Sequence, residues 1–453
     1  MNLDSRNTQT RVKHEILGNY LSIWGGITVN GLASMVQAKS ISRRDVHFVY
    51  VDCFAYAGRY SGDQETAIQG QPTEQVFGSP IIGIQELDKL ETFATSRGLD
   101  PRVNAILVER DRSAFLELVH TLEMAGFAHR VRQTGNFEGL ANGEIAVINA
   151  DCLELSQQLL AYTTSGYRRA FYLIDPWGPK GIPHGFVKSI VQNERHDVMI
   201  NFMYIDFLRK SGMLANKALS PQHQQLVNHW TAAFNGDRWK EIVSLTLQEI
   251  SDHRYWRDDV LEGIPVDDME DDDLMDDEEL ARRKEFRLVS LYREVLQAMD
   301  AGLAVKSIPL KFADRERTMF YLFLTTHDGT GALAINEVID RAQFLEDELR
   351  FRFLFAKRIA PPPGQLALAL GDPIPESPRK SVSTRPPLDI ISRDIHSRFS
   401  GRTLTRRDLY KELANSSYFP QEVNSALTGL RRSELVSFQG KLTNNSMLSF
   451  TGT

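Results

Sequence analysis

The residues best placed to do chemistry follow the apolar run 170–174. Its aromatic and branched side chains predict a buried strand. The run is followed by Asp175, Pro176, Trp177 and Gly178. Pro lacks a backbone donor and Gly permits a sharp turn, so these residues end the strand. Ligands of open α/β sheets bind at the carboxyl ends of strands, and a carboxylate beside a flat ring suits a nucleobase. Asp175, Pro176 and Trp177 are therefore the catalytic candidates, with an ordinary Asp-Pro turn and a core Trp as the alternative.

Three further acids directly follow apolar runs that predict strands: Asp52, Glu109 and Asp151. One acid at a strand end often only caps the next helix. Parallel strands joined by right-handed crossovers place all their carboxyl ends on one edge of the sheet. We therefore expect Asp52, Glu109, Asp151 and Asp175 to share one edge, which is harder to explain by capping alone.

The chain after the first of these strands predicts a tight turn that approaches a ligand closely. Rossmann-like sheets hold adenosyl cofactors in this way, and glycine makes room for the ligand. Glu109 is then placed to accept hydrogen bonds from both ribose hydroxyls, and Asp151 to contact an adenine amino group. Cys53 and Cys152 each follow one of the acids, where an inert buried thiol is the alternative. The candidate cofactor-binding residues are Asp52, Phe54, Ala55, Gly58, Glu109, Asp151 and Cys152.

Alternating strands and helices must position these residues. Apolar runs predict strands at 46–51, 104–108, 144–149, 171–174, 197–202 and 318–325. Helical spacing of apolar residues predicts helices at 11–29, 81–97, 113–126 and 153–163. Strands that alternate with helices of this length predict βαβ units and a mostly parallel sheet. The expected fold class is α/β and Rossmann-like, extending over residues 1–358.

The second half of the chain predicts an insertion, a linker and a second domain. The sequence predicts helices over 205–262 and 286–299. In the run 267–279 between them, ten of thirteen residues are acidic, which indicates a solvated connection. We therefore expect an insertion at about 205–310. Residues 359–387 are rich in Pro and Ser, which marks a linker. Within 388–453, helices at 389–398, 405–414 and 420–433 precede a possible hairpin at 435–450. That order predicts a winged helix-turn-helix domain.

This C-terminal part is basic, although the whole chain carries a net charge of −7. From residue 379 onward, twelve Lys and Arg stand against six acids. A basic module on an acidic body favours contact with nucleic acid, and Arg406, Arg407, Arg431 and Arg432 are the candidates for phosphate binding. The alternative is a winged helix that serves protein contacts only.

Length and composition limit the class of protein. The chain of 453 residues is long for one domain, and its 42% apolar and 25% charged content is that of a soluble globular protein. No apolar run approaches the roughly 20 residues that span a bilayer, and the N-terminus lacks a signal segment. Two cysteines form neither a disulfide framework nor a zinc cluster, and neither His184 nor His196 has a partner at ligand spacing. We expect a cytoplasmic protein without a membrane segment or a metal.

A larger set of residues has an order and spacing that can be compared with known families: Lys13, Ile16, Leu17, Tyr20, Leu21, Trp24, Asp52, Phe54, Ala55, Gly58, Gly78, Ser79, Pro80, Glu109, Ile174, Asp175, Pro176, Trp177, Gly178, Ile200, Asn201 and Phe202. With this set the chain resembles, over residues 11–355, the three-Cys-motif partner family (TcmP) of bacterial proteins. The layout of acids also resembles class I S-adenosylmethionine-dependent methyltransferases. The 175–178 motif is similar to the Asp-Pro-Pro-Tyr of amino-methyltransferases, except in its last two positions.

These resemblances imply S-adenosylmethionine as cofactor, methylation of a nucleic acid within a mobile-element or phage-defence system, and a neighbouring three-Cys-motif protein as partner. One departure concerns the turn after the first strand, where the family has a sequence similar to Asp-Gly-Phe-Ala-Gly-Pro-Gly. This chain has Cys53, Tyr56 and Ala57 at three of those places. A non-catalytic DNA-binding or partner-binding protein, whose pocket Tyr56 closes, is therefore the alternative, and a small-molecule or protein methyltransferase is the third.

Overall fold

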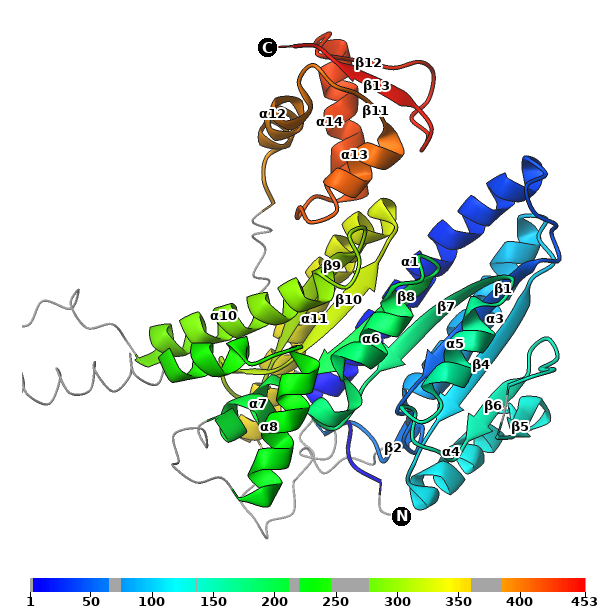
Figure 1. The fold of residues 1–453 in the computed structure, drawn as a ribbon, viewed down its shortest axis with the longest axis vertical. Helices are drawn as coiled ribbons and strands as arrows, with labels where there is room; N and C mark the ends of the chain where they lie inside the picture. The colour runs from blue at the N-terminus through cyan, green and yellow to red at the C-terminus, as the bar shows by residue number, and fades with distance from the viewer. Residues whose placement is uncertain are drawn as a thin grey trace, which may run out of the picture.

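An eight-stranded sheet forms the centre of the protein (Figure 1). In this computed structural model, the described residues are 3–64, 75–135, 137–211, 220–245, 277–359 and 385–452. The strand order is β5-β6-β4-β1-β7-β8-β10-β9. The strands comprise β1 (Val46–Asp52), β4 (Arg102–Val108), β5 (Val131–Gln133), β6 (Ile145–Ile148), β7 (Tyr167–Ile174), β8 (His196–Phe202), β9 (Ala304–Lys311) and β10 (Thr318–Thr326).

The sheet is mostly parallel, as the alternation of strands and helices predicted. The neighbouring strands from β5 to β8 pair in parallel, whereas β10 pairs antiparallel with both β8 and β9. All six expected strands are present, because strands buried on both faces read as continuous apolar runs. Two strands of this sheet were not expected: β5 has only three residues, and the edge strand β9 contains Pro309. The fold is α/β and Rossmann-like.

Helices cover both faces of the sheet, and a separate core lies on each face. Alternate residues of the central strands enter the two cores. Val49 and Val51 of β1 belong to one core and Phe48 and Tyr50 to the other. The second core is covered by α1 (Thr8–Gln37), α3 (Ser79–Ser96), α4 (Arg112–Met124) and α11 (Gly329–Ile359). The first is covered by α5 (Ser156–Thr164), α6 (His184–Val191), α7 (Tyr204–Ser211), α8 (Pro221–Ala233) and α10 (Asp277–Gln297).

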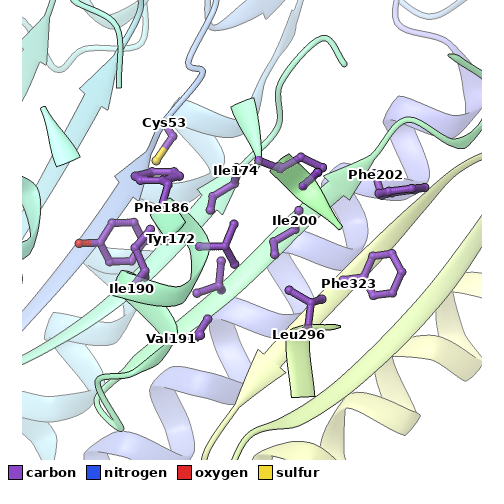
Figure 2. Packing of buried hydrophobic residues seen from close by; sticks show 14 of the residues in the cluster. Cys53, Tyr172, Ile174, Phe186, Ile190, Val191, Ile200, Phe202, Leu296 and Phe323 are labelled. Atoms are coloured by element: carbon purple, nitrogen blue, oxygen red, sulfur yellow. The ribbon is translucent and has the colours of Figure 1, made fainter. Parts of the chain in front are cut away.

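An aromatic cluster fixes the helices that follow β8. The Phe202 ring lies 4.8 Å from the Tyr292 ring of α10 and 5.9 Å from the Phe323 ring of β10, as centroid separations, and Figure 2 shows Phe202 and Phe323 in this core. Helices α7, α8 and α10 lie within about 205–310, the range in which a helical insertion was expected, whereas β9 at the end of that range belongs to the sheet. Residues 212–219 and 246–276 lie outside the described residues. Helix α10 begins at Asp277, inside the acidic run that the sequence indicated as a connection.

The C-terminal unit has three helices and a three-stranded antiparallel sheet, with strand order β11-β13-β12. Its core is separate from the two cores of the large sheet, except that Leu333 of α11 enters it. The expected linker lies outside the described residues over 360–384. The unit's elements are α12 (Leu388–Phe399), β11 (Thr403–Thr405), α13 (Arg406–Glu412), α14 (Pro420–Arg432), β12 (Val436–Ser437) and β13 (Met447–Phe450).

This unit is docked on the beginning of α11. The Asn336 side-chain amide donates to the carbonyls of Ser416 at 3.1 Å and Tyr418 at 2.8 Å, and a Cβ added to Gly329 would lie 2.6 Å from the Lys411 backbone nitrogen. Because β10 runs antiparallel to β8, its end and the start of α11 lie where the parallel strands begin. The C-terminal unit therefore sits at the edge of the sheet opposite the strand-end acids (Figure 1). No helix within the described residues is long and apolar enough to cross a membrane.

Candidate functional site

The four strand-end acids share one edge of the sheet, as expected from the sequence, because β6, β4, β1 and β7 are adjacent and parallel. Only Asp175 among them lines the cleft of about 300 Å³ that opens at this edge. The other three lie beside or beneath it. The cleft is lined by Asp4, Ser5, Asn7, Thr10, Lys13, Phe54, Ala55, Tyr56, Gly58, Arg59, Tyr60, Gly78, Ser79, Pro80, Asp175, Pro176, Trp177, Asn201, Met203, Met319 and Phe320.

Both oxygens of the Asp175 carboxylate have protein partners. Oδ2 forms an ion pair with the ammonium group of Lys13 on α1, and Oδ1 accepts a 2.6 Å hydrogen bond from the Asn201 side-chain amide on β8. Burial lowers the pKa of Lys13, but the charge and hydrogen bond of Asp175, together with Tyr60 and Asp52, outweigh this and raise that pKa above its ordinary value. The arrangement holds a carboxylate in one orientation at the cleft wall.

The turn after Asp175 presents an indole ring to solvent. Trp177 is 87% exposed at the cleft, which contradicts the alternative that it packs in the core. Gly178 has a φ of +93° and donates to the Pro176 carbonyl at 3.1 Å, so glycine permits this turn. Gly181 packs against Pro176, because an added Cβ would lie 2.3 Å from the Pro176 Cβ. A rigid turn thus carries an exposed aromatic ring beside Asp175.

Asp52 is covered by protein and does not line the cleft. Its carboxylate accepts hydrogen bonds from Ser79 Oγ at 2.7 Å, from Tyr50 Oη at 3.2 Å and from the Phe54 backbone nitrogen at 3.2 Å. Burial raises the pKa of Asp52 to about 7, although the Ser79 hydrogen bond opposes this. Asp52 therefore positions the turn after β1 and the start of α3, rather than facing the cleft.

The turn after β1 holds Tyr56 in a left-handed conformation with φ +49°. Its backbone nitrogen donates to Glu109 Oε2 at 2.8 Å, and the other Glu109 oxygen accepts from the Asp111 nitrogen at 2.6 Å. Tyr56 lines the cleft together with Phe54, Ala55 and Gly58. Gly58 has φ +70°, and an added Cβ would lie 2.8 Å from Leu118 Cδ1, so this position requires glycine.

Asp151 and the cysteines lie further along the edge. Asp151 Oδ2 lies 3.3 Å from Arg110 Nη1 and 3.7 Å from Lys180 Nζ, and Oδ1 accepts from the Leu153 nitrogen at 3.1 Å. Cys53 and Cys152 are both buried and free, and their side chains contact each other. Burial raises the pKa of the Cys53 thiol, which favours inert thiols. Within the described residues no group of three or more His, Cys, Asp or Glu could hold a metal ion.

Two cleft residues were given no role from the sequence. Lys13 stands on the apolar face of α1, beside Val12, Ile16 and Leu17, all of which are fully buried. A lysine on such a face needs a partner, and this was the available signal. Asn201 interrupts the apolar strand β8 in the same way.

The arginines of the C-terminal unit have different surroundings. Arg406 donates to Asn424 at 3.1 Å, to Asn444 at 2.8 Å and to Tyr410 at 2.9 Å, which ties α13 to α14 and to the β12–β13 loop. Arg431 lies over the Phe438 ring at 4.6 Å from its centroid. Arg407 and Arg432 are exposed. Arg406 is thus a structural connection in the described fold, whereas Arg407 and Arg432 face solvent.

No protein family and no curated protein matches this sequence. Among solved structures, protein LPL1258 from Legionella pneumophila, assigned to family DUF519, aligns with a TM-score of 0.32 and 10% identity over 71% of this chain and 85% of that chain. At this similarity no residue role is transferred.

Proposed function

We propose that the chain is an S-adenosylmethionine-dependent methyltransferase that acts on nucleic acid, within the three-Cys-motif partner family. One observation carries the proposal: an oriented Asp175 carboxylate stands beside an exposed Trp177 in a cleft at the carboxyl edge of the sheet. Ligand sites of open α/β sheets lie at that edge. A fixed acceptor and a stacking ring together suit a base with an exocyclic amino group.

The strand order supports the methyltransferase assignment. Without β5, the strands of this sheet follow one another along the chain as β1, β4, β6, β7, β8, β9 and β10, and they are numbered 1 to 7 in that order. Across the sheet from β6 to β9 the order is then 3-2-1-4-5-7-6, and strand 7 is antiparallel to its neighbours. This is the sheet arrangement of the class I methyltransferases that the sequence resembles. The three-residue β5 is an addition at one edge. The strand order alone does not identify the acceptor, which is inferred from the cleft.

The residues at the edge fit an adenosyl cofactor. Each Glu109 oxygen accepts one backbone hydrogen bond, and a carboxylate oxygen has a further lone pair for a ribose hydroxyl. Phe54, Ala55 and Gly58 line the cleft and would contact the methionyl portion. Asp151, which lies outside the cleft lining, would contact the adenine portion. When bound, the cofactor supplies an activated methyl group.

The chain's own residues then position the acceptor. Asp175 and the Pro176 carbonyl accept hydrogen bonds from the amino group, while the Trp177 indole stacks on the base. Lys13 and Asn201 hold the carboxylate and so fix the direction of these hydrogen bonds. Orientation of the reacting atoms supplies much of the rate enhancement in such transfers.

We propose further that the C-terminal unit is a winged helix that binds nucleic acid through exposed basic residues. The order α12, β11, α13, α14 and the strands β12 and β13 supports this assignment. In a filter-binding assay, Arg407→Ala and Arg432→Ala should each reduce the slope of log affinity against log salt by about one. Arg406→Ala should instead lower the melting temperature. Affinity unaffected by both exposed changes would favour a module for protein contacts.

Transfer of labelled methyl groups from S-adenosylmethionine to DNA and RNA oligonucleotides tests the function. Asp175→Ala should abolish labelling and leave cofactor affinity within about threefold, because Asp175 contacts the acceptor. The exposed Asp45→Ala variant is the matched control and should retain full labelling. Labelling that survives in Asp175→Ala contradicts the proposed role.

A non-catalytic binding protein is the second candidate, and Tyr56 favours it. Tyr56 is a bulky residue with a left-handed backbone conformation, and it lines the cleft at a turn where the resembled family has glycine. Cofactor binding separates the two functions, because a closed pocket would bind neither S-adenosylmethionine nor its demethylated product.

A further inference from the structure

The Asn201 carboxamide lies beside Asp175 because their strands are paired. Ile174 of β7 pairs in parallel with Ile200 of β8, so the next residue of each strand stands at the same edge. Asn201 is 4% exposed and lines the cleft. Its Nδ2 donates a 2.6 Å hydrogen bond to Asp175 Oδ1.

This hydrogen bond fixes which way the amide points. In the opposite orientation the Asn201 oxygen would face a carboxylate oxygen, and two acceptors repel. The oxygen Oδ1 therefore points away from Asp175. It is buried and has no hydrogen-bond partner among the described residues. A buried acceptor without a partner costs free energy, and in a binding site a ligand donor recovers that cost.

No described residue around Asn201 donates a hydrogen bond to this oxygen. Lys13 directs its ammonium group to Asp175. Met203, Met319 and Phe320 supply apolar walls to the same cleft. Oδ1 has almost no accessible surface, so a ligand reaches it by displacing side chains. The sulfur of Met203 lies 3.5 Å from Nδ2 of the same amide, and an unbranched methionine side chain readily changes its packing.

We propose that Asn201 is a specificity-determining residue that accepts an N–H of the acceptor's exocyclic amino group alongside Asp175. The inference rests on the proposed function and deepens it. An amino group offers two hydrogens: Asp175 accepts one, and Asn201 Oδ1 and the Pro176 carbonyl share the other as a three-centre hydrogen bond. A carbonyl at the same place on a base offers only lone pairs, which face Asp175 and Asn201 unfavourably. Adenine and cytosine are thereby selected over hypoxanthine and uracil.

Binding of single-stranded oligonucleotides to the full chain tests the inference without a methyl donor. The probes are thymine 12-mers with one central adenine or hypoxanthine, and a second pair with cytosine or uracil, measured by fluorescence anisotropy. Contacts to the backbone are common to both members of a pair, so the affinity ratio reports the exchange of the amino group for a carbonyl, together with the proton gained by the adjacent ring nitrogen. The wild type should prefer the amino base of at least one pair by about 100-fold.

Asn201→Leu should reduce that ratio to about tenfold, since Asp175 remains, without lowering the melting temperature by more than a few degrees. Asn201→Ala is the second variant if the leucine does not fit. Asn30→Leu, an exposed change on α1, should leave the ratio unchanged. An unaltered ratio in both folded Asn201 variants, or no preference in the wild type, overturns the inference. Cofactor binding with either result leaves the methyltransferase assignment standing, whereas absence of cofactor binding removes that assignment.

Discussion

The backbone nitrogen of Tyr56 donates a 2.8 Å hydrogen bond to the Glu109 carboxylate. The bond joins the turn after β1 to the end of β4, and it holds Tyr56 at φ +49°. The same residue lines the cleft. One position therefore controls both the conformation of the turn and the room available to a ligand.

Tyr56→Gly is expected to bind S-adenosylmethionine about tenfold more tightly than the wild type, because it removes the ring and keeps the backbone hydrogen bond. Its free energy of unfolding should change by less than about 1 kcal/mol, since relief of the left-handed strain offsets the greater entropy of the unfolded chain. Isothermal titration and thermal denaturation measure the two quantities. Ala55→Gly, in the same turn, should show no gain in affinity. Weaker binding by Tyr56→Gly would mean that the ring contacts the cofactor.

Lys13→Met should destabilise the protein by about 3 kcal/mol, because it leaves the largely buried Asp175 carboxylate without its cation. Adding Asp175→Asn should restore much of this loss. A double-mutant cycle measured by urea denaturation should give a coupling of about 2 kcal/mol. A coupling below about 0.5 kcal/mol would indicate that the pair does not fix Asp175.

Asp52 should make stability fall as the pH rises from 4 to 7. Burial raises its pKa to about 7, so the folded protein retains a proton that the unfolded chain has released above pH 4. Asp52→Asn should therefore gain stability relative to the wild type across this interval, by at most about 4 kcal/mol, and the difference should be constant above pH 7. Urea denaturation as a function of pH measures it. The exposed Asp45→Asn should follow the wild type, and a constant difference for Asp52→Asn between pH 4 and 7 would contradict the assignment.

Gly329→Val should undock the C-terminal unit, because the new Cβ would lie 2.6 Å from backbone atoms of Tyr410 and Lys411. Faster amide hydrogen exchange in 410–418, with exchange in the central strands unchanged, is the expected result. Gly331→Ala is the control, since its Cβ would meet the Thr326 hydroxyl at an ordinary 3.4 Å. Unchanged exchange in Gly329→Val would show that the contact is not required for docking.

The sheet could be predicted because its central strands are buried on both faces, so each reads as an apolar run bounded by turn residues. The edge strand β9 could not be predicted: its buried and partly exposed residues alternate over the second half, and Pro309 argues against a strand. The C-terminal helices were expected within about three residues of their ends. Their docking on α11 rests on contacts such as Asn336 with Tyr418, which no local pattern reveals.

The site was predicted only at the level of the sheet edge. Chain order placed the four acids on one edge, but which of them faces a ligand depends on partners from distant segments. Ser79 covers Asp52, and Lys13 reaches Asp175 from a helix 162 residues earlier in the chain. The exposure of Trp177 likewise follows from the turn geometry, and not from residue type.

Titration of the wild-type chain with S-adenosylmethionine is the most direct test of the proposed function. Binding of one molecule per chain with a dissociation constant below about 100 µM is expected, and Glu109→Ala should weaken it at least tenfold because the ribose loses its acceptor. Arg110→Ala, the exposed neighbour, is the control and should bind within about threefold of the wild type. No detectable binding at about 1 mM cofactor by the folded wild-type protein would contradict the account.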